Sequence, residues 1–191
     1  PTTPMEETLR ALSALVDQGK ILYYGVSEEW GGARIEKAQA IIEKYGLHPL
    51  TVIQPQYNMM DRYIEHELMD ICEKNGIGIT PFSPLAQGLL TGKYKKGQPY
   101  PEGSRATHQA DKQVNALLTD ENLDKVEALS AIAAELGTNM SVLALAWILR
   151  KDCISSVITG ASKPSQLENN LAAAGFKIPA NALKEIEKIL G

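Results

Sequence analysis

One stretch decides the fold class: Thr80-Pro81-Phe82-Ser83-Pro84-Leu85-Ala86-Gln87-Gly88-Leu89-Leu90-Thr91-Gly92-Lys93-Tyr94. A short apolar strand, predicted over 77–80, runs into a loop that is rich in proline and glycine and carries one lysine. Parallel α/β proteins build ligand sites in this way, because the backbone leaves the carboxyl end of a strand there and presents N–H groups and a charge. The stretch therefore predicts a strand of a parallel sheet followed by a binding loop.

Helices and strands alternate along almost the whole chain. The apolar periodicity predicts further strands at 21–26, 50–54 and 154–158, and helices at 3–18, 35–45, 68–74, 123–136 and 140–149, from 164 and from 180. The first helix is predicted to open with a capping box, in which Thr3 is the N-cap, Pro4 the first helical residue and Glu6 the acidic partner. Strands that are apolar on both faces and separated by helices imply a parallel sheet.

Four βα units fit two architectures. They form half of a (βα)₈ barrel or a small open sheet of the flavodoxin-like kind, which would prefer FMN, and the pattern does not choose between them. No G-x-G-x-x-G follows any predicted strand, so the sequence predicts no Rossmann fingerprint. The segment 82–119 has no sustained period, and loops of this length are usually functional or mobile.

Composition and charge exclude several classes of protein. Hydrophobic residues make up 44% and charged residues 22% of the 191 positions, as in ordinary globular domains. A net charge of −4 argues against sequence-independent nucleic-acid binding, and no apolar run approaches the roughly 20 residues that span a membrane. No signal peptide is visible, and we expect a cytoplasmic protein whose two cysteines, Cys72 and Cys153, are buried and reduced.

The predicted strand ends carry short polar side chains and one aromatic ring. They are Ser27, Gln54 with Tyr57 and Asn58, Phe82 with Ser83, and Thr159 to Ser162. This set suits hydrogen bonding to a polar ring and stacking against it. It includes no cluster with metal-ligand spacing and no nucleophile paired with a base, so neither chemistry is predicted.

The segment Gly160 to Asn170 is the best candidate for an anion site. Ser162 is predicted to cap the helix that follows, Pro164 suits its first turn, and Lys163 lies beside them. The positive end of the helix dipole would then face a phosphate. A plain capped helix start explains the same residues, but the place after the last strand favours phosphate.

Several single residues have a simpler explanation besides a functional one. Lys93 and Arg105 are typical of solvated loop residues, Tyr57 and Phe82 of packing at strand ends, and Trp147 of a core. We interpret Trp30 as a residue at a pocket rim, Asp61 and Arg62 as a local ion pair, and His108 as solvent-facing.

Taken in order, four strand-end motifs resemble those of the aldo-keto reductases, especially the branch with the potassium-channel β subunits and their bacterial relatives. Gly19-Lys20-Ile21 with Tyr24-Gly25-Val26-Ser27 resembles the family's fifth strand, and Gln54-Pro55-Gln56-Tyr57-Asn58 its sixth. Phe82 to Tyr94 resembles the seventh, and Gly160-Ala161-Ser162 through Gln166 to Asn170 the eighth. The resemblance covers essentially the whole chain. It implies that residues 1–191 are one unit, the C-terminal half of a (βα)₈ barrel with strands five to eight and an extra C-terminal helix.

The resemblance also implies an extended NADP(H) as the cofactor. Ser27 and Gln54 would hydrogen-bond the nicotinamide carboxamide, and Phe82 would stack on its ring. The loops that hold the rest of the cofactor would contribute two sets of residues. Those around the pyrophosphate would be Ser83, Pro84, Leu85, Gln87, Gly88 and Lys93. Those at the adenosine end and its 2′-phosphate would be Arg105, Gly160, Ser162, Lys163, Gln166, Asn169 and Asn170.

Three departures from the family pattern matter. Glu28 stands where many members have Asn, which would weaken the nicotinamide contacts, and Asn169 replaces a common Glu at the adenine. The family's catalytic Asp, Tyr, Lys and His lie on the first four strands. We expect this chain to start after the fourth strand and to lack them, so the sequence predicts no catalytic residue.

The resemblance implies that the parent reaction is the reversible, NADP(H)-dependent reduction of small aldehydes and ketones to alcohols. We expect this chain to supply most of the cofactor site and to be inactive alone. Its expected partners are a small carbonyl substrate in the complete barrel, and a second copy or a complementing N-terminal half across its exposed strand edges. The alternative is a non-catalytic NADPH-sensing interaction protein related to the channel β subunits.

Overall fold

The computed structural model describes residues 2–27, 30–107 and 112–191, and the fold is built on a parallel sheet of three short strands. These are β1 (Gly25–Ser27), β2 (Val52–Gln54) and β3 (Gly78–Ile79), in the order β1-β2-β3. In the register, Val26 lies opposite Ile53, which lies opposite Ile79. The predicted parallel α/β fold is confirmed, with strands shorter than predicted.

The fourth predicted strand, 154–158, is wrong as a strand. Ile154 forms a single parallel bridge to Ile79, and the Ser155 N–H donates to the Ile79 carbonyl at 2.9 Å. The Ile158 N–H then donates to the carbonyl of Pro81 at 3.0 Å. Pro81 has no N–H to return to the neighbouring run, so the ladder stops there although the chain continues beside β3.

Three helices accompany the strands, namely α1 (Met5–Asp17), α2 (Gly32–Tyr45) and α3 (Leu68–Lys74). The predicted capping box of α1 is wrong. Pro4 is the N-cap and no side chain caps the helix, because Glu6 pairs with Arg10 at 2.9 Å instead. The predicted end of α2 is confirmed, since Gly46 takes a left-handed φ of 60° there.

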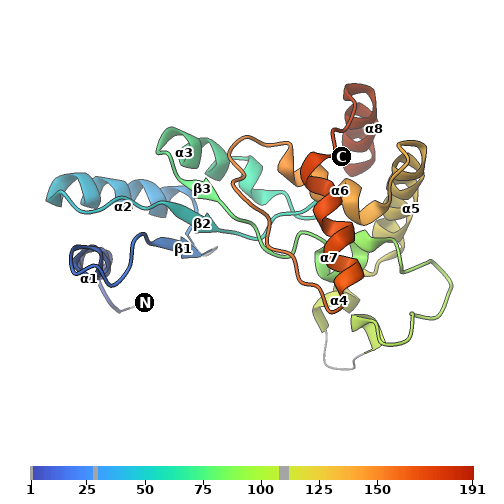
Figure 1. The fold of residues 1–191 in the computed structure, drawn as a ribbon, viewed down its shortest axis with the longest axis horizontal. Coiled ribbons are helices and arrows are strands. Elements are labelled where there is room, and N and C mark those ends of the chain that lie inside the picture. Colours follow the sequence, from blue (N-terminus) through green and yellow to red (C-terminus); the bar gives the residue numbers. More distant parts are fainter. Residues whose placement is uncertain (1, 28–29, 108–111) are drawn as a thin grey trace.

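The helices that follow β3 gather at one end of the molecule, opposite α1 to α3 (Figure 1). They are α4 (Lys112–Leu117), α5 (Asp120–Glu135), α6 (Met140–Leu149), α7 (Pro164–Leu171) and α8 (Ala180–Leu190). Short 3₁₀ turns lie at Tyr63–Glu65, before α3, and at Ala86–Thr91, Arg105–Thr107 and Ala172–Gly175, after β3. The segment 82–119 is thus more ordered than predicted, since it holds α4 and two of these turns. The prediction for His108 lies outside the described residues.

Helix α6 lies at the centre of this group of helices. Eight of its residues are buried, and Trp147 is fully buried, as predicted. The core is continuous from α6 through α5 to the sheet. Leu129 of α5 and Ile53 of β2 are both fully buried in it. Burial of such side chains contributes about 1.5–3 kcal/mol each.

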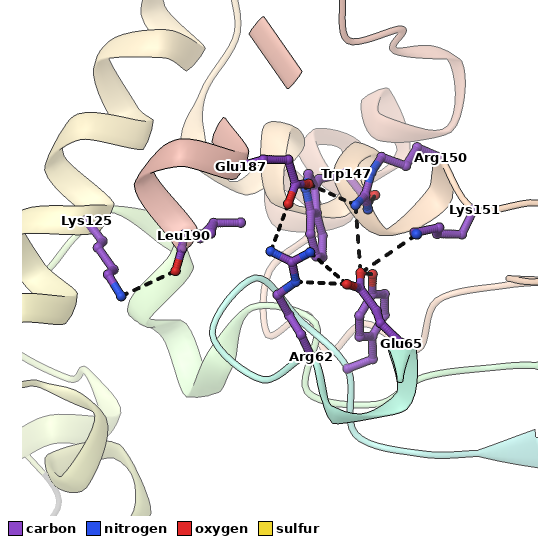
Figure 2. A network of polar contacts seen from close by, with 9 residues as sticks. Arg62, Glu65, Lys125, Trp147, Arg150, Lys151, Glu187 and Leu190 are labelled. Atoms are coloured by element: carbon purple, nitrogen blue, oxygen red, sulfur yellow. Dashed lines mark hydrogen bonds and ion pairs between the residues drawn. The ribbon is translucent and has the colours of Figure 1, made fainter. Parts of the chain in front are cut away.

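A polar network fastens α8 to this core (Figure 2). Glu187 of α8 pairs with Arg62 at 2.8 Å and with Arg150 at 3.0 Å. Arg62 also pairs with Glu65 at 2.7 Å. The predicted Asp61–Arg62 ion pair is therefore wrong, because Arg62 turns toward the two glutamates.

In the described part of the chain, no single helix is both long enough and apolar enough to cross a membrane. Helices α5 and α6 satisfy length and composition only as a pair, which is bent by 89°.

Candidate functional site

Three of the predicted ring contacts lie at the carboxyl edge of the sheet. Ser27 and Gln54 end β1 and β2, are exposed, and lie opposite each other in the register. Phe82 follows β3, forms a bridge with Gln56, and donates its N–H to the Pro55 carbonyl at 3.0 Å. The strands thus bring two hydrogen-bonding side chains and one aromatic ring to the same edge.

The loop after β3 has an unusual backbone. Ser83, Ala86 and Gln87 have φ values of 52°, 46° and 57°, and they are the only non-glycine residues with positive φ in the described ranges. L-residues rarely adopt this conformation, and such positions cluster at functional sites. Gly88 continues the run with φ 99°. The backbone therefore marks this loop as a candidate binding site.

Side chains of this loop connect to a cation from a second segment. The Gln87 Nε2 donates to the Ser83 hydroxyl at 2.9 Å, and the Gln87 Oε1 accepts from an Arg105 guanidinium N–H. The Lys93 ammonium lies next to Gly88, where a Cβ built on the glycine would be 3.1 Å from the Lys93 Nζ. Two exposed cations and an amide therefore surround one loop.

The predicted free backbone N–H groups are only partly present. The N–H groups of Ala86, Gly88 and Leu90 donate to carbonyls inside the loop, at 3.0, 2.9 and 3.2 Å. They are engaged because the positive-φ residues fold the loop into successive tight turns. An anion at this site would therefore be held mainly by side chains, above all Lys93 and Arg105.

The segment before α7 differs from its prediction. Lys163, not Ser162, is the N-cap of α7, and Pro164 occupies the first turn as predicted. The Gln166 Oε1 accepts from both the N–H and the hydroxyl of Ser162, at 2.8 and 3.2 Å. The Gln166 amide thus takes the place that the prediction gave to a phosphate, because it reaches back over the first turn of its own helix.

The two loops start side by side. Since the Ile158 N–H donates to the Pro81 carbonyl, the segment leading to Gly160 leaves the sheet next to the one leading to Phe82. Gly160, Ser162, Lys163 and Gln166 are exposed.

Asn169 and Asn170 lie farther along α7. The Asn169 Oδ1 accepts from the Asn139 Nδ2 at 2.6 Å, which links it to the start of α6. Asn170 lines a cavity of about 310 Å³ between α6, α7 and the run 155–159, together with Leu145, Leu149 and Leu167. This cavity is mostly apolar and does not include the loop after β3.

Several other residues singled out in the sequence pack against the protein itself. Pro84 is buried, and Leu85 packs against the core. Tyr57 is fully buried, with its ring centroid 5.4 Å from that of Trp147, so it packs and does not face a ligand. Trp30 is half-buried under the Arg34 guanidinium, at 4.9 Å from the ring centroid. Glu28, which was expected to weaken the nicotinamide contacts, lies outside the described residues.

Sequence reasoning named Asn58 as a polar residue at a strand end but missed its burial, and it missed the buried Ser104 altogether. The Asn58 amide donates to the Ser83 carbonyl at 3.1 Å, and the Ser104 hydroxyl, beside Arg105, is the one buried side-chain oxygen that lacks a hydrogen-bond partner in the described part of the chain. The signal for Asn58 was its place after a strand, next to an aromatic residue. No pattern in the sequence indicates the burial of Ser104.

The donor set fits a phosphate-bearing ligand. Cations, hydroxyls and a carboxamide surround the strained loop, and guanidinium and ammonium groups are the usual partners of phosphate oxygens. Among the described residues, no group of three or more His, Cys, Asp and Glu side chains is placed to hold a metal ion.

Comparison with known proteins identifies relatives of this chain. The model of the aldo/keto reductase family matches residues 1–191. A putative voltage-gated potassium channel subunit beta from Schizosaccharomyces pombe is 42% identical over 100% of this chain and 56% of its own length. An L-glyceraldehyde 3-phosphate reductase from Escherichia coli is 40% identical over 90% of this chain and 49% of its own length.

A solved structure has a similar fold. A glycerol dehydrogenase from Gluconobacter oxydans superposes with a TM-score of 0.78 at 26% sequence identity, over 98% of this chain and 54% of that protein. The chain thus spans about half the length of the relatives that it matches.

Proposed function

The chain belongs to the aldo/keto reductase family, and from this premise we propose that it forms the C-terminal half of a (βα)₈ barrel and binds NADP(H). The family generally uses NAD(P)H. The observation that carries the proposal is the group formed by Ser83, Gln87 and Arg105, with Lys93 beside it.

The loop after β3 would hold the pyrophosphate. Lys93 and Arg105 approach it from the two ends of one irregular segment, and both are exposed, so neither charge is used up in a buried ion pair. Gln87 fixes the Arg105 guanidinium through its Oε1. A phosphate held by two cations gains charge-assisted hydrogen bonds, which are roughly twice as strong as neutral ones.

The sheet edge would hold the nicotinamide. Ser27 and Gln54 lie opposite each other with exposed side chains, which suits the two ends of a carboxamide. Phe82 follows the next strand and offers the aromatic surface. When bound, NADPH supplies the hydride, while these residues orient its ring.

The start of α7 would hold the adenosine end. Lys163 is exposed at the helix N-cap, where its charge is available to a 2′-phosphate. In this proposal Gln166 exchanges its bonds to Ser162 for the ligand, and Asn170 lies one turn beyond. The contact between Lys163 and the 2′-phosphate would favour NADPH over NADH, because NADH has no 2′-phosphate.

We propose the reversible reduction of a small aldehyde or ketone as the reaction of the complete barrel. The support comes from two relatives, whose names state that they reduce L-glyceraldehyde 3-phosphate and oxidise glycerol. The described residues are assigned to binding and orientation, and none is assigned to proton transfer.

The outer edges of the sheet support the assignment to half of a barrel. β1 is the first strand in the order β1-β2-β3, and large exposed apolar residues, Leu22 and Tyr23, precede it. Ile158 and Leu171 are exposed near the opposite edge. We propose that the remaining half of a barrel, or a second copy of this chain, covers both edges.

A second function follows from the relative of 42% identity. A channel β subunit of that kind favours an interaction protein that senses NADPH, which would bind the cofactor without appreciable turnover. Turnover of glyceraldehyde by the barrel completed with the other half would favour the enzyme, and tight NADPH binding without turnover would favour the sensor.

The test is a titration of the 191-residue polypeptide with NADPH and NADH, followed by calorimetry. We expect Arg105→Ala and Lys93→Ala each to weaken NADPH binding by about tenfold or more, because each removes a charge-assisted contact. Lys95→Ala is the matched control, an exposed lysine two residues away, and should change the affinity less than about twofold. No NADPH binding, or equal effects of all three variants, would contradict the proposal.

A further inference from the structure

We propose that Asn58 is a positioning residue for the loop after β3. Its buried amide anchors the Ser83 carbonyl, and through Ser83 and Gln87 it fixes where the exposed Arg105 guanidinium lies. The inference rests on the proposed function for the identity of the ligand, but its geometry is independent of that function.

Asn58 lies in a tight turn after β2 and is only 2% exposed. Its backbone and that of Asp61 exchange two hydrogen bonds, at 3.0 and 3.1 Å. Its Oδ1 accepts from the N–H groups of Met60 and Asp61, at 2.8 and 3.0 Å. Two N–H donors therefore fix the orientation of the amide, and its Nδ2 must point the other way.

The Nδ2 points to the second loop. It donates to the Ser83 carbonyl at 3.1 Å, and the same carbonyl accepts from the Ala86 N–H at 3.0 Å. Two donors thus hold the carbonyl of a serine whose φ is 52°, a conformation that L-residues adopt only where the surroundings impose it. Asn58 is the partner that comes from outside the loop, so it ties the loop to the sheet.

The position of Ser83 determines, through Gln87, where the Arg105 guanidinium lies. With its backbone held, the Ser83 hydroxyl accepts from Gln87, and Gln87 accepts from Arg105. A free arginine side chain on the surface samples many rotamers, and ordering it on binding costs free energy. The chain of contacts from Asn58 to Arg105 orders the guanidinium before a ligand arrives.

One substitution separates the two roles of the Asn58 side chain, which are to stabilise its own turn and to hold the Ser83 carbonyl. Asn58→Asp keeps an oxygen that accepts from Met60 and Asp61 but loses the donor to Ser83. Asn75→Asp is a matched control, because the Asn75 Nδ2 also donates to a backbone carbonyl, that of Ile71 at 2.7 Å, away from the loop.

Hydrogen exchange without any ligand is the first measurement. Asn58→Asp should speed exchange of the Ala86 amide by about tenfold, because the Ser83 carbonyl, to which Ala86 donates, loses its second donor. Asn75→Asp should leave the exchange rate of the Ala86 amide unchanged. Unchanged Ala86 exchange in a folded Asn58→Asp protein would overturn the inference, whatever the chain binds.

A double-mutant cycle with NADPH as the probe is the second measurement. Asn58→Asp should weaken binding by about tenfold in the unaltered chain and by less than about twofold in the Arg105→Ala background, since the guanidinium that it positions is then gone. Equal losses in both backgrounds would mean a general structural effect and would overturn the inference.

A third variant covers the case in which Asn58→Asp does not fold. Ser83→Ala leaves the buried turn intact and removes the hydroxyl between the anchor and Gln87. It should show the same non-additivity with Arg105→Ala, and additive effects would contradict the chain of contacts. If the unaltered chain binds no NADPH, the proposed cofactor fails, and hydrogen exchange alone decides the role of Asn58.

Discussion

The indole Nε1 of Trp147 on α6 donates a hydrogen bond of 3.1 Å to the Glu187 carboxylate on α8. The Arg150 guanidinium carbon lies 3.8 Å from the centroid of the same indole, and Arg62 approaches it at 5.3 Å (Figure 2). Both arginines also pair with Glu187. One carboxylate thus joins the C-terminal helix, the core helix and the segment after β2.

Glu187→Gln should lower the free energy of unfolding by about 1–2 kcal/mol, because the amide keeps an acceptor for Trp147 but loses the charge between two arginines. Urea denaturation at pH 7 measures this change. Glu185→Gln, an exposed position on the same helix, is the control and should change stability by less than about 0.5 kcal/mol. Equal losses in the two variants would show that the network does not hold α8.

Glu65 makes part of this stability dependent on pH. Burial raises the pKa of its carboxyl, but hydrogen bonds from Tyr57 and Arg62 and the charges of Arg62 and Lys151 outweigh burial, so the pKa lies below its ordinary value. A lowered pKa contributes stability above the unfolded-state value of about 4.3, and this is lost as the pH falls through the folded-state value.

The free energy of unfolding should therefore fall as the pH drops below about 4.5, and less steeply in Glu65→Gln, which does not titrate. Urea midpoints at pH 7, 5, 4 and 3 give the comparison. Glu7→Gln, at an exposed position of α1, should retain the slope of the unaltered chain. A Glu65→Gln protein with the same pH dependence would contradict this account.

The sequence predicts the fold class but not the extent of its strands. Alternating apolar runs identify β1, β2 and β3, because buried strands and helices differ in period. The run 154–158 has the same composition but only one bridge, since Pro81 on its neighbour lacks an N–H. That failure depends on which residue lies opposite, and periodicity does not contain this information.

The same limit applies to the candidate site. The motifs predict that Ser83, Gln87 and Arg105 belong to the site. Only the structure shows that Asn58 contacts Ser83, that Ser83 contacts Gln87, and that Gln87 contacts Arg105. The predicted N-cap at Ser162 is wrong because a side chain four residues later, Gln166, competes for its N–H. Local propensity does not resolve competition between two polar partners.

Gly25 allows β1 to lie close to β2, because glycine has no Cβ. A Cβ at Gly25 would lie 2.2 Å from the Val52 carbonyl oxygen, a backbone atom that cannot move without breaking the ladder. Gly25→Ala should lower the free energy of unfolding by about 1–3 kcal/mol and displace Ser27 from its place opposite Gln54. Thermal unfolding measures the first effect. Gly175→Ala is the control, because a Cβ at Gly175 would meet no atom within 4 Å.

Cys72 should be the slower of the two thiols to react. It is fully buried on α3, and burial, with a smaller effect of Cys153, raises its pKa to about 11. At pH 8 only about a thousandth of such a thiol is ionised, and the thiolate is the nucleophile. Cys153 is half-buried, and its pKa is also raised, chiefly by burial.

In the folded protein at pH 8, a disulfide reagent should therefore label Cys153 first and Cys72 more slowly by about 100-fold or more. Mass spectrometry of peptides taken over time separates the two sites. In urea, where burial is lost, the two rates should converge. In the folded Cys153→Ser variant, the one remaining thiol, Cys72, should react slowly. Rapid labelling of Cys72 in the folded chain would mean that α3 opens from the sheet far more often than its packing implies.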